Sequence, residues 1–330
     1  MDRYALVQDW LSRQFEGQSF SLDPASSDAS FRRYFRVTLR DATFIVMDAP
    51  PDREDCRPFL RVARLMSSAG LHVPAILAQD LELGFLLLSD LGSTTYLAAL
   101  SNGNADELYR DATDALILWQ RASVEGVLPL YDEALLQREL DLFPEWYLRR
   151  HLGLELDAQQ KRSLAGVFKL IIANNISQPR SYVHRDYMPR NLMLSTPNPG
   201  VLDFQDAVYG PITYDVASLF KDAFISWDEG RVIDWTIRYW ERARSAGLPV
   251  RSDFGEFYRD CEWMGLQRHL KVLGIFARIC HRDGKPAYVK DTPRFVAYVR
   301  AVCERYASLS PLLRLLDQIA EREPVSGQTR

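Results

Sequence analysis

Lysine is scarce in this chain. Only 6 of its 40 basic side chains are lysine, and none of them falls within the first 160 residues. A general preference of the genome for arginine codons accounts for the low total. The absence still excludes any reaction or phosphate contact that would need a lysine in the N-terminal half.

Cysteines and long apolar segments are also few. The four cysteines lie far apart and form no CxxC pair, which argues against a disulfide scaffold or a zinc site and favours buried thiols in a reducing compartment. They are Cys56, Cys261, Cys280 and Cys303. No run of about 18 apolar residues occurs, and residues 1–15 lack the apolar core of a signal peptide. These features predict a cytoplasmic protein without a membrane segment.

An excess of basic charge is missing as well. The 40 basic side chains stand against 44 acidic ones, the net charge is −4, and no long basic run occurs. Binding to nucleic acid depends on clustered positive charge, so this class of function has no support. What is present is a globular composition, 47% hydrophobic, over 330 residues, a length typical of about two domains or one bilobal unit. We expect a monomer.

Residues 1–90 carry mostly strand signals. Residues 31–39 and 43–49 are rich in aromatic and β-branched side chains and predict an antiparallel hairpin, while residues 24–30 (PASSDAS) predict a loop before it. Residues 72–78 and 84–88 predict two further strands. Helical spacing predicts two helices in the same region, one through Tyr4, Val7, Trp10 and Leu11 and one through Phe59, Val62, Ala63 and Met66.

The pattern changes after the break at residues 89–92 (SDLG). Leu108, Ala112, Ala115, Leu116 and Trp119 recur at helical spacing, and most of the chain up to about Leu315 is periodic in the same way. The tail, residues 321–330, is expected to be frayed and solvated. The chain therefore divides into a β-rich segment, 1–90, and a mostly helical segment, 91–330. The predicted fold class is α+β.

A motif of the form H-x-D-x-x-x-x-N follows a short apolar run in the second segment. It consists of His184, Asp186 and Asn191, and Asp203 ends another apolar run twelve residues later. Phosphoryl transfer needs a carboxylate that orients the hydroxyl and accepts its proton, and an amide and a second carboxylate that hold Mg²⁺ on the nucleotide. Oxygen ligands suit this hard cation. Unrelated polar residues in loops are the alternative, and the joint order and spacing make it the weaker one.

With these motifs and the β-rich segment before them, the chain resembles the aminoglycoside phosphotransferase and choline kinase family. The resemblance covers nearly the whole chain and implies a protein-kinase-like bilobal fold, with residues 1–90 as the nucleotide-binding lobe. It also implies ATP and Mg²⁺ as cofactors, Asp186 as the catalytic base, and Asn191 and Asp203 as the Mg²⁺ ligands. His184 would pack the catalytic loop and Asp215 would brace it, although an acid at a helix start is also favoured by the helix dipole.

Two more positions take roles from this resemblance. The break at residues 89–92 would be the hinge, where backbone groups of Ser89 and Leu91 bind adenine, and the alternative is an ordinary strand end. Asp206, three residues after the metal acid, would contact Mg²⁺ through water.

The phosphate-binding parts of the family are absent here. The strand that usually carries a lysine reads FIVMDA over residues 44–49, and the helix over 57–69 lacks the glutamate that would pair with it. The glycine-rich loop is replaced by residues 26–33 (SSDASFRR). Our hypothesis is that Arg32 or Arg33 binds the phosphates, because arginine pairs bidentately with phosphate, together with the hydroxyls of Ser27 and Ser30. The alternative is that both arginines are solvated residues of an edge strand.

The acceptor is suggested by charge and by a closer resemblance. Residues 260–300 contain eight Lys/Arg and four Asp/Glu, which suits a neutral or anionic acceptor better than a polycationic aminoglycoside. Residues 46–51 (VMDAPP), 143–148 (FPEWYL), 267–271 (QRHLK) and 282–285 (RDGK) resemble the anomeric amino-sugar kinases of bacterial cell-wall recycling. This resemblance implies phosphorylation of N-acetylmuramate and N-acetylglucosamine at C1, towards UDP-N-acetylmuramate.

The same resemblance implies which side chains contact the sugar. They are Glu145, Trp146, Gln267, Arg268 and His269. Trp146 as a core residue and Arg268 as a helix cap are the alternatives. Two other functions stay open: a kinase of the same family for an aminoglycoside, choline or homoserine, and a catalytically weak nucleotide-binding module, which the missing lysine and glutamate would favour. The intact Asp186, Asn191 and Asp203 speak against the module.

Overall fold

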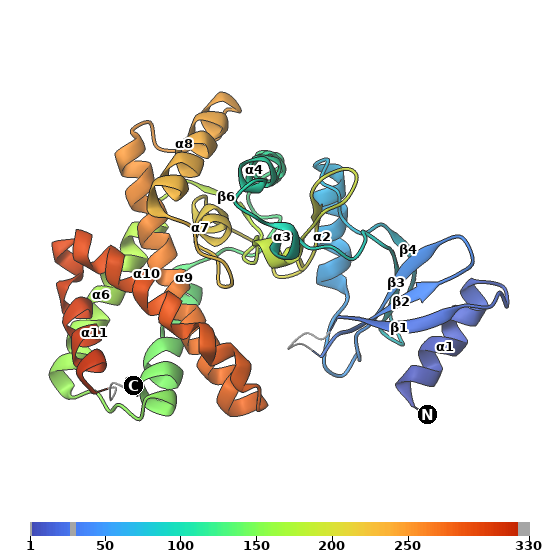
Figure 1. Ribbon diagram of the computed structural model, residues 1–330, viewed down its shortest axis with the longest axis horizontal. Coiled ribbons are helices and arrows are strands. Elements are labelled where there is room, and N and C mark those ends of the chain that lie inside the picture. The colour runs from blue at the N-terminus through green and yellow to red at the C-terminus, as the bar shows by residue number, and fades with distance from the viewer. Residues whose placement is uncertain (1, 27–30, 323–330) are drawn as a thin grey trace. The chain divides into compact units, whose positions relative to one another are not determined.

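The computed structural model describes residues 2–26 and 31–322 (Figure 1). The chain forms two compact units: unit 1 consists of residues 1–119 and 189–207, and unit 2 of residues 120–188 and 208–330. The boundary predicted after residue 90 marks the end of the N-terminal sheet, whereas unit 1 continues beyond it and takes in a later segment. The contacts of residues 189–207 with the rest of unit 1 explain the difference.

Unit 1 contains a five-stranded antiparallel sheet with the order β1-β2-β3-β5-β4. Its strands are β1 (Ser21–Ser26), β2 (Arg33–Thr38), β3 (Thr43–Asp48), β4 (Ile76–Asp80) and β5 (Phe85–Ser89). The predicted hairpin is confirmed as β2 and β3. The two predicted helices are α1 (Arg3–Gln14) and α2 (Arg57–Ser68). Helix α1 covers one face of the sheet, with Val7, Trp10 and Leu11 in a common core with Phe35, Val46 and Phe85.

The prediction of a loop over residues 24–30 is wrong at its start. Pro24 and Ser26 belong to β1 and pair with β2, with an irregular register between them. A proline is tolerated there because β1 is an edge strand, so the missing N–H removes no hydrogen bond from a second neighbour. The rest of the predicted loop, including Ser27 and Ser30, lies outside the described residues.

Residues 189–207 fold back onto unit 1. They contain the short helix η2 (Pro189–Asn191) and the strands β7 (Leu192–Met193) and β8 (Gly200–Val201). Backbone bridges join Met193 to Thr95 and Gly200 to His72, and the Phe59 and Phe204 rings lie 4.8 Å apart. Unit 1 also holds α3 (Tyr96–Ala99) and most of α4 (Ala105–Arg121). The segment that carries Asn191 and Asp203 is therefore part of the N-terminal unit.

Unit 2 is mostly helical, with one two-stranded sheet. The strands are β6 (Arg180–Val183) and β9 (Val208–Pro211). The helices are α5 (Glu133–Leu140), the π-helix η1 (Phe143–His151), α6 (Ala158–Ile176), α7 (Tyr214–Phe220), α8 (Glu229–Ser245), α9 (Phe254–Asp283), η3 (Pro286–Asp291), α10 (Thr292–Arg305), η4 (Ala307–Leu309) and α11 (Ser310–Arg322). Helix α9 is central, since η1, α6, α7 and α10 all pack against it (Figure 1).

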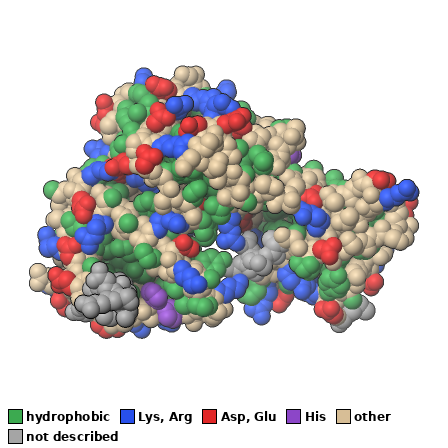
Figure 2. Space-filling model, in the orientation of Figure 1, with side chains coloured by type: hydrophobic (Ala, Val, Ile, Leu, Met, Phe, Trp, Pro, Cys, Tyr) green, Lys and Arg blue, Asp and Glu red, His purple; other side chains and the backbone are tan. Residues whose placement is uncertain are grey.

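A close approach fixes the packing of α9 on η1. At Gly274 an added Cβ would lie 2.4 Å from the backbone carbonyl carbon of Leu142, so this crossing requires glycine. On the face drawn in Figure 2, acidic and basic side chains are interspersed over the helices of unit 2. Within the part of the chain that the structure describes, no helix is both long enough and apolar enough to cross a membrane. All four cysteines are free thiols, three of them buried, as predicted.

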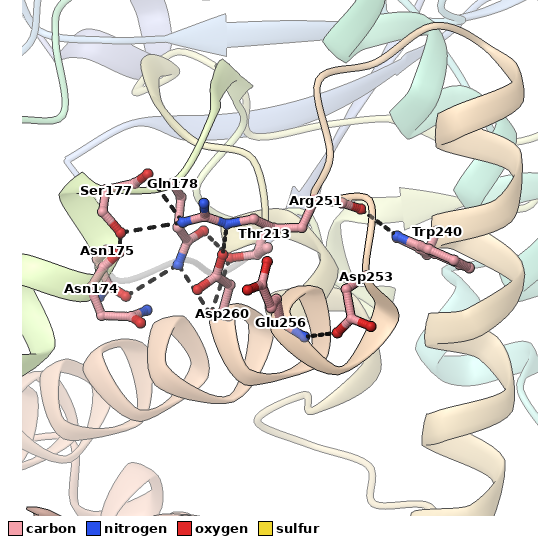
Figure 3. Close-up of polar contacts among 10 residues, drawn as sticks. All are labelled: Asn174, Asn175, Ser177, Gln178, Thr213, Trp240, Arg251, Asp253, Glu256 and Asp260. Carbon is pink, nitrogen blue, oxygen red and sulfur yellow. Dashed lines mark hydrogen bonds and ion pairs between the residues drawn. The ribbon is translucent and has the colours of Figure 1, made fainter.

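A buried polar network joins the ends of three helices in unit 2 (Figure 3). Arg251 Nε donates to Asp260 Oδ2 over 3.0 Å, and Gln178 Nε2 donates to the Asp260 carbonyl over 3.1 Å. Thr213 Oγ1 donates to Gln178 Oε1 over 2.6 Å. The network therefore ties the C-terminal end of α6 to the residue before α7 and to the second turn of α9.

Candidate active site

The loop after β6 carries the first half of the motif, in unit 2. The backbone N–H groups of His184 and Arg185 donate to the two carboxylate oxygens of Asp215, over 2.7 and 3.0 Å. The N–H of Asp186 donates to His184 Nδ1 over 3.2 Å. Arg185 has a φ of 77°, in the left-handed region that non-glycine residues rarely adopt. Asp215, in the first turn of α7, thus holds the backbone directly before Asp186.

Burial controls the ionisation of Asp215. Its side chain is inaccessible to solvent, and this burial raises the pKa of Asp215 to about 7, although the N–H groups of His184 and Arg185 act in the opposite direction. The charge of Asp186 raises the pKa of Asp215 further, and the charge of Arg268 lowers it. Because the raised pKa favours the protonated acid, this group stabilises the fold at low pH, and the contribution is lost as pH rises through about 7.

A pocket of about 300 Å³ lies within unit 1, in the size range of small-molecule sites. Four residues singled out from the sequence line it: Ser89, Leu91, Asn191 and Asp203. The sheet contributes Tyr34, Arg36, Ile45 and Leu88, and the returning segment contributes Arg190, Met193, Leu202 and Phe204. One wall is thus the sheet and another is the segment that carries the proposed metal ligands.

The break after β5 is held by an ion pair that the sequence did not indicate. Arg36 Nε donates to Asp90 Oδ2 over 2.7 Å, and its Nη2 donates to the Gly92 carbonyl over 2.8 Å. Asp90 also accepts the N–H of Gly92, which has a φ of 98°. The N–H of Ser89 donates to the Ala75 carbonyl over 2.9 Å and is therefore already used. Burial raises the pKa of Asp90, but the bond to Arg36 holds it below its ordinary value.

Asn191 and Asp203 lie side by side in the pocket. Asn191 Nδ2 is 3.4 Å from Asp203 Oδ2, and Gln205 Nε2 donates to Asp203 Oδ1 over 2.8 Å. Among the described residues, no group of three or more His, Cys, Asp or Glu side chains is placed to hold a metal. One carboxylate and one amide nevertheless fit Mg²⁺, which keeps several waters and takes its other ligands from phosphates. Asp206 is exposed and does not line the pocket.

The two loop arginines of our phosphate hypothesis have carboxylate partners. Arg32 Nη2 lies 3.0 Å from Glu54 Oε2, and Arg33 Nε donates to Asp48 Oδ2 over 3.0 Å. Asp48 is fully buried and also accepts a bond from Arg3 on α1. Neither Arg32 nor Arg33 lines the pocket, so their contact with phosphate remains a hypothesis.

Arg190 is a pocket residue that sequence reasoning missed. It lines the pocket next to Asn191, whereas β3 contributes only the apolar Ile45 in the region where a lysine was expected. Its position inside the motif, directly before the asparagine, was the available signal. Arg36 lines the pocket too, but its guanidinium is engaged by Asp90 and Gly92.

The five predicted sugar contacts fall into two sets. Gln267, Arg268 and His269 are buried on α9, and successive helical positions point about 100° apart, so the three cannot all face one ligand. Gln267 donates to Glu139 over 3.0 Å, Arg268 Nη2 lies 3.6 Å from the Met188 sulfur, and His269 Nε2 lies 3.2 Å from the Lys221 carbonyl oxygen.

Glu145 and Trp146, on η1, form the second set. Glu145 pairs with Arg149 and Arg150, and the Arg150 guanidinium lies 4.2 Å from the Trp146 ring centre. A role of these five side chains in sugar binding remains a prediction.

Comparison with known proteins gives consistent matches. A model of the Phosphotransferase enzyme family matches residues 21–251. The chain is 59% identical over 300 residues to an N-acetylmuramate/N-acetylglucosamine kinase of Pseudomonas aeruginosa, covering 91% of this chain and 89% of that one. It is 48% identical over 335 residues to the kinase of the same name from Neisseria meningitidis, covering 100% of both chains.

Among solved structures, an ADP-bound aminoglycoside phosphotransferase matches with a TM-score of 0.60 at 15% identity, over 88% of this chain and 96% of that one. A likeness at this identity speaks for the fold alone. It confirms the predicted α+β, protein-kinase-like fold class.

Proposed function

Because the chain belongs to the phosphotransferase enzyme family, we propose that it transfers the γ-phosphoryl group of ATP to the C1 hydroxyl of N-acetylmuramate and N-acetylglucosamine. The observation that carries this proposal is the 48–59% identity to kinases named for these two sugars, over at least 91% of the chain. The reaction uses ATP and would take place in the cytoplasm, with a sugar 1-phosphate as product for UDP-N-acetylmuramate synthesis.

The nucleotide would occupy the pocket of unit 1. Backbone groups of Ser89 and Leu91 would contact adenine, and the phosphates would extend towards Asn191 and Asp203. These two residues would hold Mg²⁺, which when bound neutralises charge on the phosphate oxygens. Arg190 would contact the phosphates from the same wall, in addition to the contacts proposed for Arg32, Arg33 and the hydroxyls of Ser27 and Ser30.

Asp186 would act on the acceptor. Its carboxylate would accept the hydrogen bond of the C1 hydroxyl, orient this oxygen for attack on the γ-phosphorus, and take the proton late in the reaction. An anomeric hydroxyl is more acidic than an ordinary alcohol, so a carboxylate is a sufficient base. Asp215 and His184 would keep the loop in place through the bonds described above.

The acceptor can be tested with a panel of alcohols. ADP release is measured with ATP, Mg²⁺ and, in separate reactions, N-acetylglucosamine, N-acetylmuramate, choline, homoserine, an aminoglycoside and water alone. We expect turnover with the two N-acetyl sugars well above the water background. Turnover with another acceptor alone would assign the chain to a different branch of the family, and no turnover with any would favour the nucleotide-binding module.

A further inference from the structure

Glu139, near the end of α5, is a buried carboxylate that meets four side chains. Its Oε1 accepts from Arg185 Nη2 over 2.6 Å and from Lys271 Nζ over 3.0 Å. Its Oε2 accepts from Gln267 Nε2 over 3.0 Å and from the Tyr131 hydroxyl. All five residues belong to unit 2, and Glu139 and Lys271 are each more than nine-tenths buried.

The charges in this cluster depend on one another. Burial raises the pKa of Glu139, but Lys271 and Arg185 outweigh it and hold this pKa at about 2. Burial lowers the pKa of Lys271, and Glu139 more than offsets it. Lys271 Nζ also donates to the Tyr214 hydroxyl over 3.1 Å, directly before Asp215 in the chain. The cluster therefore connects α5, α9 and the start of α7 to the side chain of Arg185.

Arg185 connects this cluster to Asp186, the proposed catalytic base. It has a φ of 77°, which L-residues rarely adopt because Cβ approaches the neighbouring backbone, and it directly precedes Asp186. Its N–H is fixed by Asp215 over 3.0 Å, and its guanidinium is fixed by Glu139 over 2.6 Å. The left-handed turn before Asp186 is thus held at its backbone and at its side chain by two different elements.

We propose that Glu139 is a positioning residue for phosphoryl transfer: by anchoring the Arg185 guanidinium, it maintains the left-handed turn and so fixes the direction of the Asp186 carboxylate. This role rests on the proposed function of Asp186 as base. Lys271 keeps Glu139 ionised for that contact. Nothing in the motif H-x-D-x-x-x-x-N indicates the role, because Glu139 lies 46 residues before Arg185.

Glu139→Gln tests the role, and Asp260→Asn is the matched control. Asp260 is also a buried carboxylate paired with an arginine of unit 2, but its partner Arg251 lies in the network of Figure 3. We expect Glu139→Gln to lower kcat about 100-fold, as small misplacements of a reacting group do, while KM for ATP stays unchanged because the nucleotide pocket lies within unit 1. Asp260→Asn should lower Tm by less than Glu139→Gln does, because burial already raises the pKa of Asp260, and it should leave kcat near that of the unsubstituted protein.

Two further variants separate the positioning of Asp186 from the effect of an unpaired buried charge on stability. Glu139→Gln/Lys271→Met removes one charge of each sign, so it should recover part of the lost Tm, but Arg185 still lacks its anchor and kcat should stay low. Arg185→Lys keeps the charge and shortens the reach, and it should lower kcat about tenfold with little change in Tm. Together these variants keep the test valid if Glu139→Gln alone folds poorly.

The outcomes are distinct. Recovery of full kcat in the double variant, or a loss of kcat in Asp260→Asn equal to that in Glu139→Gln, would overturn the positioning role. ATP hydrolysis with water as acceptor is measured in parallel and should fall by the same factor in Glu139→Gln. If the unsubstituted protein phosphorylates neither sugar, the proposed function fails, and the hydrolysis rates still decide the role of Glu139.

Discussion

Asn191 and Asp203 are the two residues proposed to hold Mg²⁺. They meet at 3.4 Å in the pocket of unit 1, and only the Asp203 side chain carries a charge. A metal contact on a phosphoryl oxygen contributes several kcal/mol to the transition state, so Asp203→Asn should lower kcat/KM by about 100-fold or more, with a higher Mg²⁺ requirement. Asp41→Asn, at an exposed position in the turn between β2 and β3, is the control, and an equal loss there would contradict the assignment of Asp203.

Arg190 and the pair Arg32 and Arg33 are the proposed phosphate contacts, and each is tested separately. A charge-assisted hydrogen bond to a phosphate contributes about 1.5–3 kcal/mol, so Arg190→Ala should raise KM for ATP by about tenfold or more. Arg32→Ala/Arg33→Ala is measured beside it under the same conditions. If the double variant leaves KM for ATP untouched, the hypothesis about the loop before β2 is wrong, and if Arg190→Ala leaves it untouched, the contact from Arg190 is excluded.

Spacing alone indicates only some of the candidate site residues. Asp186, Asn191 and Asp203 could be proposed because phosphoryl transfer needs these residue types in one order along a short stretch. Asp90 and Glu139 could not, because their partners Arg36 and Arg185 lie 54 and 46 residues away. Gln267 and His269 were proposed as sugar contacts because of a short sequence resemblance. Both side chains are buried on α9, which the sequence did not indicate.

At the scale of the elements, helix α9 packs closely on the backbone at the start of η1. Gly274 sits where a Cβ would lie 2.4 Å from the Leu142 backbone, so Gly274→Ala should destabilise the protein by about 1–3 kcal/mol through overpacking. Gly166, in the exposed part of α6, has nothing within 4 Å of an added Cβ, so Gly166→Ala should stabilise by about 1 kcal/mol. Urea unfolding gives the change in the free energy of unfolding for each variant. A change of the same sign in both variants would contradict this account of the packing.

The spacing of apolar residues predicted most of the helices and strands, but not the strand β1 or the π-helical form of η1. Val7, Trp10 and Leu11 mark α1 because helical spacing puts them on one face, and all three are buried. The strand at Pro24–Ser26 was missed because its pairing with β2 outweighs a local composition that favours a loop. The π-helical form of η1 has no signal in the periodicity.

At the scale of the whole molecule, buried charge links stability to pH. The pKa of Glu139 is held at about 2 in the folded protein, below its ordinary value of 4.5, so its contribution is complete above pH 4.5 and is lost as pH falls towards 2. The difference corresponds to about 3 kcal/mol. The free energy of unfolding, measured by urea titration between pH 6 and 2.5, should fall less steeply in Glu139→Gln than in the unsubstituted protein, and identical slopes would contradict the contribution.

The two compact units divide the chain differently from the segments predicted from the sequence, whose boundary after residue 90 stays a prediction. A change from strand to helix signals is visible in the sequence. The return of residues 189–207 to unit 1 is not, because it rests on pairing such as Met193 with Thr95 and Gly200 with His72. The fold class was nevertheless predictable, since the motif and the β-rich segment before it resemble one family.

The position of the transferred phosphate tests the central claim most directly. The protein is incubated with ATP, Mg²⁺ and N-acetylglucosamine, and the product is examined by ³¹P and ¹H NMR, with Asp186→Asn as the control that should still bind ATP but transfer nothing. We predict phosphate coupled to the proton on C1, and only with the unsubstituted protein. Phosphate on any other hydroxyl, or equal transfer by Asp186→Asn, would contradict the account.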